Sequence, residues 1–154
     1  MFMGRLILVL LFFCNVTVVF SQKVFSLYSP DNCLEVRINI GEKMEYSVWK
    51  GGERLLCNSS LSMLLGDGQK WGHRALVRKI QRRKADRNIS SPFYKKAHVK
   101  DCYNELELHF RGDYGVIFRA YNDGVAYRFI STGKKSFVVK EETVEYCFPD
   151  DWKS

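Results

Sequence analysis

The sequence predicts an all-β fold, and three observations support this prediction. Val, Ile, Tyr and Phe alternate with polar residues in short runs, as they do in strands that bury one face. Turn-forming residues interrupt these runs at intervals of about ten residues. No apolar repeat of helical period extends beyond about two turns after residue 21. The chain is therefore expected to form sheets joined by short turns.

The first 21 residues predict export from the cytoplasm. One positive charge, Arg5, precedes the apolar run Leu6–Phe20, and the small residue Ser21 follows it. This order is typical of a cleaved signal peptide. The run is shorter than the roughly 20 apolar residues that span a membrane, so we favour cleavage after Ser21 over anchoring. We expect residues 22–154 to be periplasmic or secreted, as one domain without a membrane segment.

The first part of the mature chain predicts a three-stranded meander. In each strand, apolar residues alternate with polar ones, which indicates that one face is buried. The expected strands are Val24–Leu27, Cys33–Ile40 and Met44–Trp49. Residues Ser29–Asn32 supply the first turn, because Ser, Pro, Asp and Asn all favour turns.

The middle of the chain gives weaker signals. Leu61–Leu65 is predicted as a strand, and Val77–Ile80 as the start of another strand that runs into a basic stretch. Residues 84–100 show no apolar alternation, so we interpret them as a long loop or irregular crossing.

The last third gives the sharpest strand signals. Tyr103–Phe110 alternates, and Val116–Tyr121 and Val125–Ile130 flank Asn122–Gly124, whose residues tolerate the positive φ of tight turns. Both faces of this hairpin are fairly apolar, which predicts a central position covered on both sides. Phe137–Tyr146 is expected to continue the same sheet.

The length of the hairpin loop decides which residue faces Arg119. A two-residue loop places Arg119 opposite Arg128, and like charges in that position are destabilising unless a carboxylate shares them. A three-residue loop, which we favour, places Arg119 opposite Tyr127. With either loop, we expect both arginines to pair with carboxylates, for which Glu105 and Glu107 on the preceding strand are candidates.

The formal net charge of +7 comes largely from a basic stretch between Lys70 and Lys100. Such stretches occur in proteins that bind nucleic acid, but no nucleic-acid-binding motif surrounds this one, and the signal peptide argues against that function. We expect no nucleic-acid partner. A solvated face, or a face that meets an acidic neighbouring domain, is the favoured interpretation.

Four cysteines remain after removal of the signal peptide. We expect most of them to be small buried side chains, although export permits disulfides and four cysteines allow three pairings. Their wide spacing matches no zinc pattern. They are Cys33, Cys57, Cys102 and Cys147.

Four segments together resemble the N-terminal domain of glycoside hydrolase family 97, a family of secreted α-glucosidases and α-galactosidases. The resemblance covers the chain from about Tyr28 to Trp152, and the order and spacing of the segments make it specific. The segments are Tyr28–Asn32, Met44–Val48, Asp101–Leu106 and Phe118–Phe129, the last reading Phe-Arg-Ala-Tyr-Asn-Asp-Gly-Val-Ala-Tyr-Arg-Phe.

The resemblance implies a β-supersandwich related to galactose-mutarotase-like domains, here incomplete. It also implies a (β/α)8 catalytic barrel as the partner domain, an oligosaccharide substrate and a calcium ion near the junction of the domains. No catalytic residue or metal ligand of the family can be placed on this chain. We therefore expect a non-catalytic domain of an exo-α-glycosidase that ends before the barrel and is inactive alone. A stand-alone secreted carbohydrate-binding or adhesion domain is the alternative.

The acidic residues do not predict a catalytic pair. Glycoside hydrolysis requires two carboxyl groups at a controlled separation, whereas the acids of this chain lie in turns or beside basic residues. We expect ion pairing or turn formation for the obvious candidates, which are Glu105, Glu107, Asp123, Asp150 and Asp151.

Aromatic side chains are the candidates for carbohydrate contact, because non-catalytic domains usually bind sugars on aromatic platforms. Packing in the core or against another domain is the simpler role for such rings. The candidates are Trp49, Trp71, Tyr94 and Trp152, of which Trp49 falls on the polar face of its strand. The three histidines show no metal-binding spacing, and we expect no metal site or cofactor in this chain.

Overall fold

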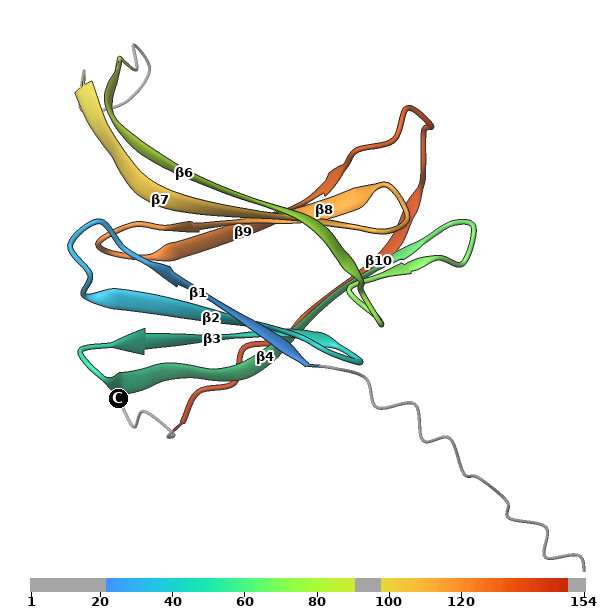
Figure 1. The fold of residues 1–154 in the computed structure, drawn as a ribbon, viewed down its shortest axis with the longest axis horizontal. Coiled ribbons are helices and arrows are strands. Elements are labelled where there is room, and N and C mark those ends of the chain that lie inside the picture. The colour runs from blue at the N-terminus through green and yellow to red at the C-terminus, as the bar shows by residue number, and fades with distance from the viewer. Residues whose placement is uncertain (1–21, 91–97, 150–154) are drawn as a thin grey trace, which may run out of the picture.

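A computed structural model describes residues 22–90 and 98–149, which form two antiparallel sheets stacked as a sandwich (Figure 1). The predicted all-β class and the meander are confirmed. The first sheet has the order β1 (Lys23–Tyr28), β2 (Leu34–Ile40), β3 (Met44–Lys50), β4 (Glu53–Leu65) and β10 (Val139–Val144), with β5 (Lys70–Trp71) paired to β4. The second sheet has the order β6 (Val77–Ser90), β7 (His98–Phe110), β8 (Tyr114–Ala120) and β9 (Val125–Ser131).

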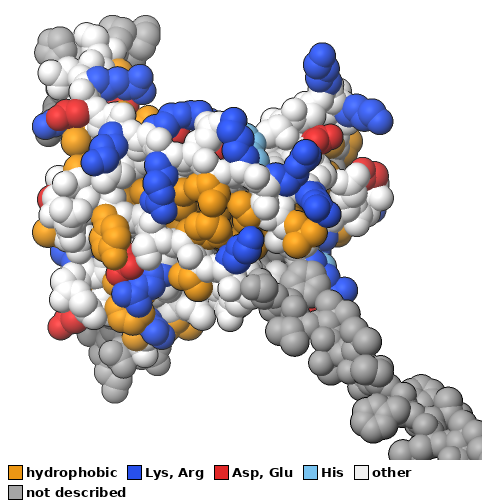
Figure 2. Space-filling view, in the orientation of Figure 1, with side chains coloured by type: hydrophobic (Ala, Val, Ile, Leu, Met, Phe, Trp, Pro, Cys, Tyr) orange, Lys and Arg blue, Asp and Glu red, His pale blue; other side chains and the backbone are white. Residues whose placement is uncertain are grey.

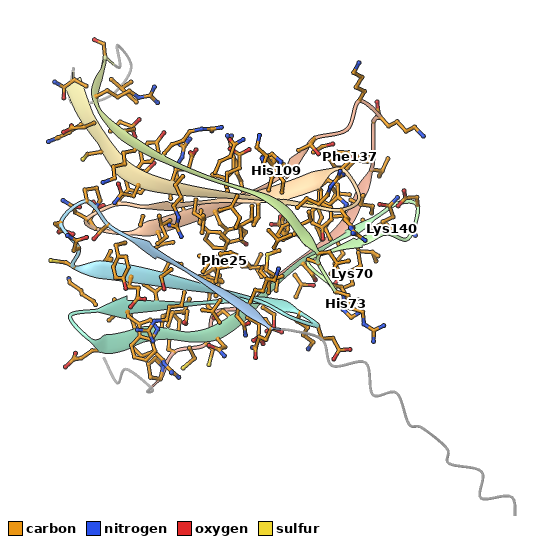
Figure 3. The ribbon with its side chains drawn as sticks, in the orientation of Figure 1. Phe25, Lys70, His73, His109, Phe137 and Lys140 are labelled. Atoms are coloured by element: carbon orange, nitrogen blue, oxygen red, sulfur yellow. The ribbon has the colours of Figure 1, made fainter. Side chains whose placement is uncertain are left out.

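The core lies between the sheets and follows the alternation of the sequence. Along β2 the apolar residues are buried and face the second sheet, whose β7 and β8 supply the opposing side chains. The fully buried members of this core include Val36, Ile38, Met44, Leu106, Leu108 and Phe118. On the side of the sandwich drawn in Figure 2, hydrophobic side chains remain visible among Lys and Arg, and the half-buried Phe25 lies there (Figure 3).

The prediction of a loop is wrong for residues 84–90 and 98–100, whereas residues 91–97 lie outside the described part. Strands β6 and β7 pair along their whole length, from Val77 opposite Phe110 to Ser90 opposite His98. Their far ends curve away from the first sheet (Figure 1). No core packs against them there, so the alternation of apolar and polar residues that marks a strand is missing. Cross-strand charge pairs support this part instead, including Arg87 with Asp101, whose Nε and Oδ2 atoms lie 2.9 Å apart.

The hairpin between β8 and β9 has a four-residue loop, so neither predicted register is correct. Ala120 pairs with Val125, and the Tyr121 N–H donates to the Gly124 carbonyl at 2.8 Å. This register places Phe118 opposite Tyr127 on the core side, whereas the favoured three-residue loop would have placed Arg128 opposite Phe118. Burial of aromatic residues therefore decides the register. Four-residue loops are commonly built on turns that need no positive φ.

The segment that was expected to continue the second sheet instead joins the first one. Strand β10 pairs with β4, with Val144 opposite Leu61. As a result, β9 has a strand neighbour only on its β8 side within the described residues. Strand β8 is almost entirely buried, but β9 is half exposed, so the expected two-sided cover holds for only one strand of the hairpin.

The expectation that most cysteines are buried is also wrong. Cys33 and Cys147 are exposed, Cys57 and Cys102 are half-buried, and all four are free thiols in the structure. The residues that the structure describes include no helix of the length and hydrophobicity needed to cross a membrane. The predicted signal peptide lies outside the described residues.

Candidate functional site

Three neighbouring strands place oppositely charged side chains in register on the outer face of the second sheet. Arg83 on β6, Glu105 on β7 and Arg119 on β8 are direct cross-strand partners. Glu105 is 4% exposed, and its two carboxylate oxygens accept hydrogen bonds from Arg83 Nη1 at 3.1 Å and Arg119 Nε at 2.7 Å. The guanidinium of Arg119 also lies 4.3 Å from the centroid of the Tyr103 ring. The predicted carboxylate partner of Arg119 is confirmed.

Glu107 extends this cluster along β7. Its carboxylate lies 3.0 Å from Arg83 Nη1 and 2.9 Å from His109 Nε2. Both carboxylates thus share one arginine, which supports the predicted ion pairing and leaves neither free to act as a nucleophile or acid. Asp123 lies in the exposed hairpin turn, and residues 150–151 lie outside the described part.

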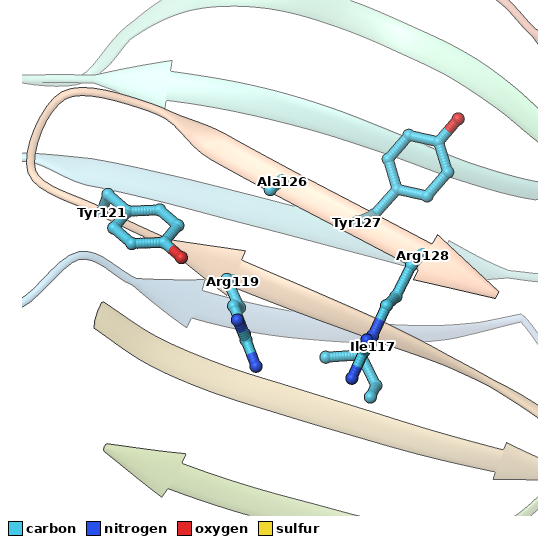
Figure 4. A pocket seen from close by; sticks show the side chains of 6 residues that line it. All are labelled: Ile117, Arg119, Tyr121, Ala126, Tyr127 and Arg128. Carbon is cyan, nitrogen blue, oxygen red and sulfur yellow. The ribbon is translucent and has the colours of Figure 1, made fainter. Parts of the chain in front are cut away.

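A shallow groove borders the charge cluster between β8 and β9 (Figure 4). Its lining residues are Ile117, Arg119, Tyr121, Ala126, Tyr127 and Arg128. Arg128 is exposed and has no ion pair with any residue that the structure describes. The expectation of a carboxylate partner for Arg128 is therefore not met within this part of the chain, and the groove presents a cation that an acidic group could bind.

A larger pocket lies at the end of the sandwich, where the turn after β4, the turn between β7 and β8 and the segment before β10 meet. Its volume of about 470 Å³ falls within the range of roughly 300–1,000 Å³ typical of small-molecule sites. Trp71 and Phe137 provide its aromatic surface, and Figure 3 shows Phe137 at this end of the molecule. Its polar lining includes Asp67, Gln69, Asp113, Ser131, Lys134, Lys135 and Ser136.

Trp71 forms the floor of this pocket but is only 4% exposed. Its ring stacks on Tyr114, with centroids 4.9 Å apart and planes 5° from parallel, and Phe137 packs against it at 5.0 Å. The indole Nε1–H is buried and has no hydrogen-bond acceptor among the described residues. Since a buried polar hydrogen without an acceptor is unfavourable, this atom leaves a hydrogen bond for a bound molecule or water to complete.

Gly72 holds Trp71 in this position. Its φ of +83° favours glycine, and a Cβ atom there would lie 2.5 Å from the Leu61 carbonyl oxygen. The Gly72 carbonyl accepts from the Met44 N–H at 2.8 Å, and its own N–H donates to the Tyr114 hydroxyl at 3.3 Å. Burial raises the pKa of Tyr114, so this hydroxyl stays protonated and fixed against the glycine.

The other aromatic candidates differ in their surroundings. Trp49 is half-buried, with the guanidinium carbons of Arg37 and Arg54 at 4.4 Å and 4.5 Å from its ring centroid, and its Nε1–H donates to Ser47 Oγ at 3.1 Å. Its ring is thus already engaged by the protein. Tyr94 and Trp152 lie outside the described residues. Sugar contact by all four candidates stays a prediction.

Sequence reasoning missed Phe137 as a pocket residue. The alternation places it in a strand, where its side chain would join a sheet, whereas the strand begins only at Val139 and Phe137 is 43% exposed. The basic Lys134–Lys135 pair before it was the available signal for a turn.

No metal-binding cluster is found in the described residues. They contain no group of three or more His, Cys, Asp or Glu side chains that could hold an ion. They therefore do not, by themselves, fit the calcium ion that the resemblance implies.

Comparison with known proteins identifies the family. Residues 27–154 match the family model described as Glycosyl-hydrolase 97 N-terminal. A retaining alpha-galactosidase from Bacteroides thetaiotaomicron is 44% identical over 131 residues, which cover 85% of this chain and 20% of that protein.

Solved structures share the fold. A Glycoside Hydrolase Family 97 enzyme from Pseudoalteromonas sp. strain K8, solved in complex with acarbose, superposes with a TM-score of 0.73 at 20% identity, over 82% of this chain and 20% of that one. A beta-arabinopyranosidase gives a TM-score of 0.72 at 28% identity, over 81% of this chain and 21% of that one. The chain thus spans about a fifth of the length of these relatives, and it belongs to the N-terminal domain family of glycoside hydrolase family 97.

Proposed function

We propose that this chain is the carbohydrate-contacting, non-catalytic N-terminal domain of an exported exo-α-glycosidase that acts on α-galactosides or α-glucosides. The observation that carries the proposal is the pocket over Trp71, which combines aromatic rings with a polar rim. Sugars present apolar ring faces together with many hydroxyl groups, so they suit a surface that offers both aromatic area and hydrogen-bonding groups.

The described acids support a non-catalytic role. Glu105 and Glu107 both lie within 3.1 Å of Arg83, on a face that the charge cluster covers. A glycosidase pair needs one acid to be protonated or one carboxylate to reach the anomeric carbon, and neither is compatible with this pairing. The catalytic acids would then lie in the portion of the relatives, about four-fifths, that this chain does not span.

The exposed surface supports docking against a further domain, which in our proposal is the (β/α)8 barrel. The open edge of β9 offers unpaired backbone groups, which natural proteins usually cover. Large apolar side chains near β10 are exposed as well, and they include Val138 at 70%, Tyr146 at 64% and Phe148 at 60%. An acidic group on the partner domain could bind Arg128 in the groove beside β9.

The apolar run at the N-terminus supports export, and it is the basis for proposing a periplasmic or secreted location. Export would bring the domain to extracellular polysaccharide fragments.

Sugar binding can be tested by isothermal titration of the chain with maltotriose and with an α-galactoside such as raffinose. We expect affinity for at least one of the two sugars, and a loss of tenfold or more in Phe137→Ala, because this exposed ring supplies the accessible aromatic surface. Phe148→Ala is the matched control, since Phe148 is the same residue type and is also exposed, at 60% against 43% for Phe137, but lies outside this pocket. Binding that is absent in the wild type, or unchanged in Phe137→Ala, would refute the assignment of the pocket.

The expected lack of glycosidase activity is tested in a separate assay. We expect no release of nitrophenol from aryl α-glucosides or α-galactosides above the buffer rate. Hydrolysis that persists after further purification, and that Glu105→Gln abolishes, would overturn the non-catalytic role.

A further inference from the structure

Two of the four cysteines in the described residues lie close together where the chain leaves β10. The Cys57 N–H, on β4, donates to the Cys147 carbonyl at 2.6 Å. Ser59, which is fully buried, completes the contact, because its hydroxyl donates to the Cys57 carbonyl at 3.0 Å and accepts from the Cys147 N–H at 3.1 Å. A backbone hydrogen bond and the bridging hydroxyl of Ser59 therefore hold Cys147, three residues after the end of β10, beside Cys57.

We propose that Cys57 and Cys147 form a disulfide bond when the chain meets an oxidising environment. The Cα atoms of directly opposed antiparallel residues lie roughly 4.5–5.5 Å apart, and disulfides span Cα distances of about 4.4–6.8 Å. The direct backbone hydrogen bond between Cys57 and Cys147 implies a comparable spacing, so the disulfide bond requires no change in the fold. This inference does not depend on the proposed sugar-binding function.

The side chains agree with the backbone geometry. A hydrogen bond with the Cys57 side chain raises the pKa of Cys147, together with a smaller effect of burial, which agrees with the closeness of the two backbones. Cys147 is exposed and Cys57 is half-buried, so an oxidant can reach at least one sulfur.

The other two cysteines have different neighbours. The Cys33 thiol lies against the Asp31 carbonyl at 3.7 Å, and Cys102 is opposite Asp86 on the β6–β7 pair. The structure therefore supports a single bond between Cys57 and Cys147, with Cys33 and Cys102 left as thiols.

The oxidant we name is a small disulfide such as oxidised glutathione. One protein thiolate attacks a sulfur of this disulfide, forms a mixed disulfide and releases one glutathione thiolate. The second protein thiolate attacks the protein sulfur of the mixed disulfide, forms the Sγ–Sγ bond and releases the second glutathione. Two electrons and two protons pass from the cysteines to the glutathione, which is reduced to two thiols.

The bond would fix the segment after β10 to β4. Tyr146 and Phe148 flank Cys147 and cover a cavity that Tyr46 and Val48 of β3 also line. The bond would hold this apolar cover in place, and it would close a long loop through most of the domain, which stabilises the fold chiefly by restricting the unfolded chain.

The test is to map the disulfide in the full 154-residue chain. The chain, in a clarified extract, is equilibrated with oxidised and reduced glutathione, blocked with N-ethylmaleimide and digested with trypsin. Each of the four cysteines after residue 21 falls on its own tryptic peptide, which spans 24–37, 55–70, 101–111 or 141–153, and Cys14 falls on peptide 6–23 where the N-terminal segment is retained. We expect a linked species of peptides 55–70 and 141–153 that disappears on reduction, while the other two peptides carry the maleimide.

Two variants and one denatured sample serve as controls. Cys147→Ser should leave Cys57 alkylated, whereas Cys33→Ser should leave the linked species unchanged. The same treatment in urea should spread the links over several pairs, since the native pairing is then lost. Oxidation should also raise the midpoint of thermal unfolding of the wild type by on the order of 10 °C.

The wild-type map decides the matter even if a variant fails to fold. Maleimide on both peptides 55–70 and 141–153 after oxidation would overturn the proposal. So would equal amounts of links to peptide 24–37 or peptide 101–111.

Discussion

Replacing Gly72 by alanine should destabilise the domain markedly, for two separable reasons. The positive φ of +83° costs an alanine roughly 1–2 kcal/mol. The new Cβ would also lie 2.5 Å from the Leu61 carbonyl oxygen, which is backbone and cannot rotate away. Relief requires β5 to shift, which weakens the hydrogen bond from Met44 N–H and costs about 1 kcal/mol more. The total loss of unfolding free energy is then about 2–3 kcal/mol.

Gly51→Ala provides the matched control. Gly51 also has a positive φ, of +58°, but nothing lies within 4 Å of the position that a Cβ atom would take there. This variant should lose only about 1 kcal/mol, so the difference between the two variants measures the contact with the β4 backbone. Urea unfolding followed by tryptophan fluorescence gives both values, and thermal midpoints should differ by about 4 °C for each kcal/mol. Equal destabilisation of the two variants would refute the steric argument.

Three further changes test the charge cluster, the core and one surface carboxylate. Glu105→Gln should lower the free energy of unfolding, measured with urea, by about 1–3 kcal/mol, because two arginines lose a buried carboxylate. The control Glu53→Gln, at an exposed position, should leave this free energy almost unchanged. Phe118→Ala removes a fully buried ring and should cost about 3–5 kcal/mol by the same measurement; a loss below 1 kcal/mol would contradict this account of the core. The hydrogen bond from Arg37 lowers the pKa of Glu35 below its ordinary value of 4.5, so the stability it contributes is present above that value and is lost as the pH falls through the lower, folded-state pKa. Arg37→Met should return the Glu35 midpoint towards 4.5 in an NMR titration, and an unchanged midpoint would exclude the assigned cause.

The sandwich core could be predicted because burial imposes a period of two on the sequence. Val36, Ile38 and Leu106 all lie on the faces that the alternation assigns to the core. The far part of β6 could not be predicted, because both of its faces meet solvent and no period remains. The length of the hairpin loop was predicted wrongly for another reason. Turn residues alone suggested a short loop, whereas the pairing of Phe118 with Tyr127 across the sheet requires a longer one.

The candidate site could be predicted only in part. Trp71 was singled out as an aromatic residue, but its burial and its stacking on Tyr114 depend on β5 pairing with β4 and packing against the second sheet, which no local pattern indicates. Phe137 reaches the pocket through the irregular segment before β10, and such segments leave no periodic signal. The contact of Cys57 with Cys147 requires β10 to join the first sheet, the reverse of the expected placement.

The protruding ends of β6 and β7 are joined by charge and backbone pairing, with almost no apolar burial. This tip should therefore unfold as a unit of its own, with β6 and β7 separating there while the sandwich stays folded. Because the ion pair of Arg87 with Asp101 lies near solvent, dissolved salt weakens it, whereas salt leaves Leu106 and Leu108 sealed in the interior. Raising the ionic strength should therefore speed amide hydrogen exchange at the tip of β6 and β7, at salt concentrations that leave exchange in the core unchanged.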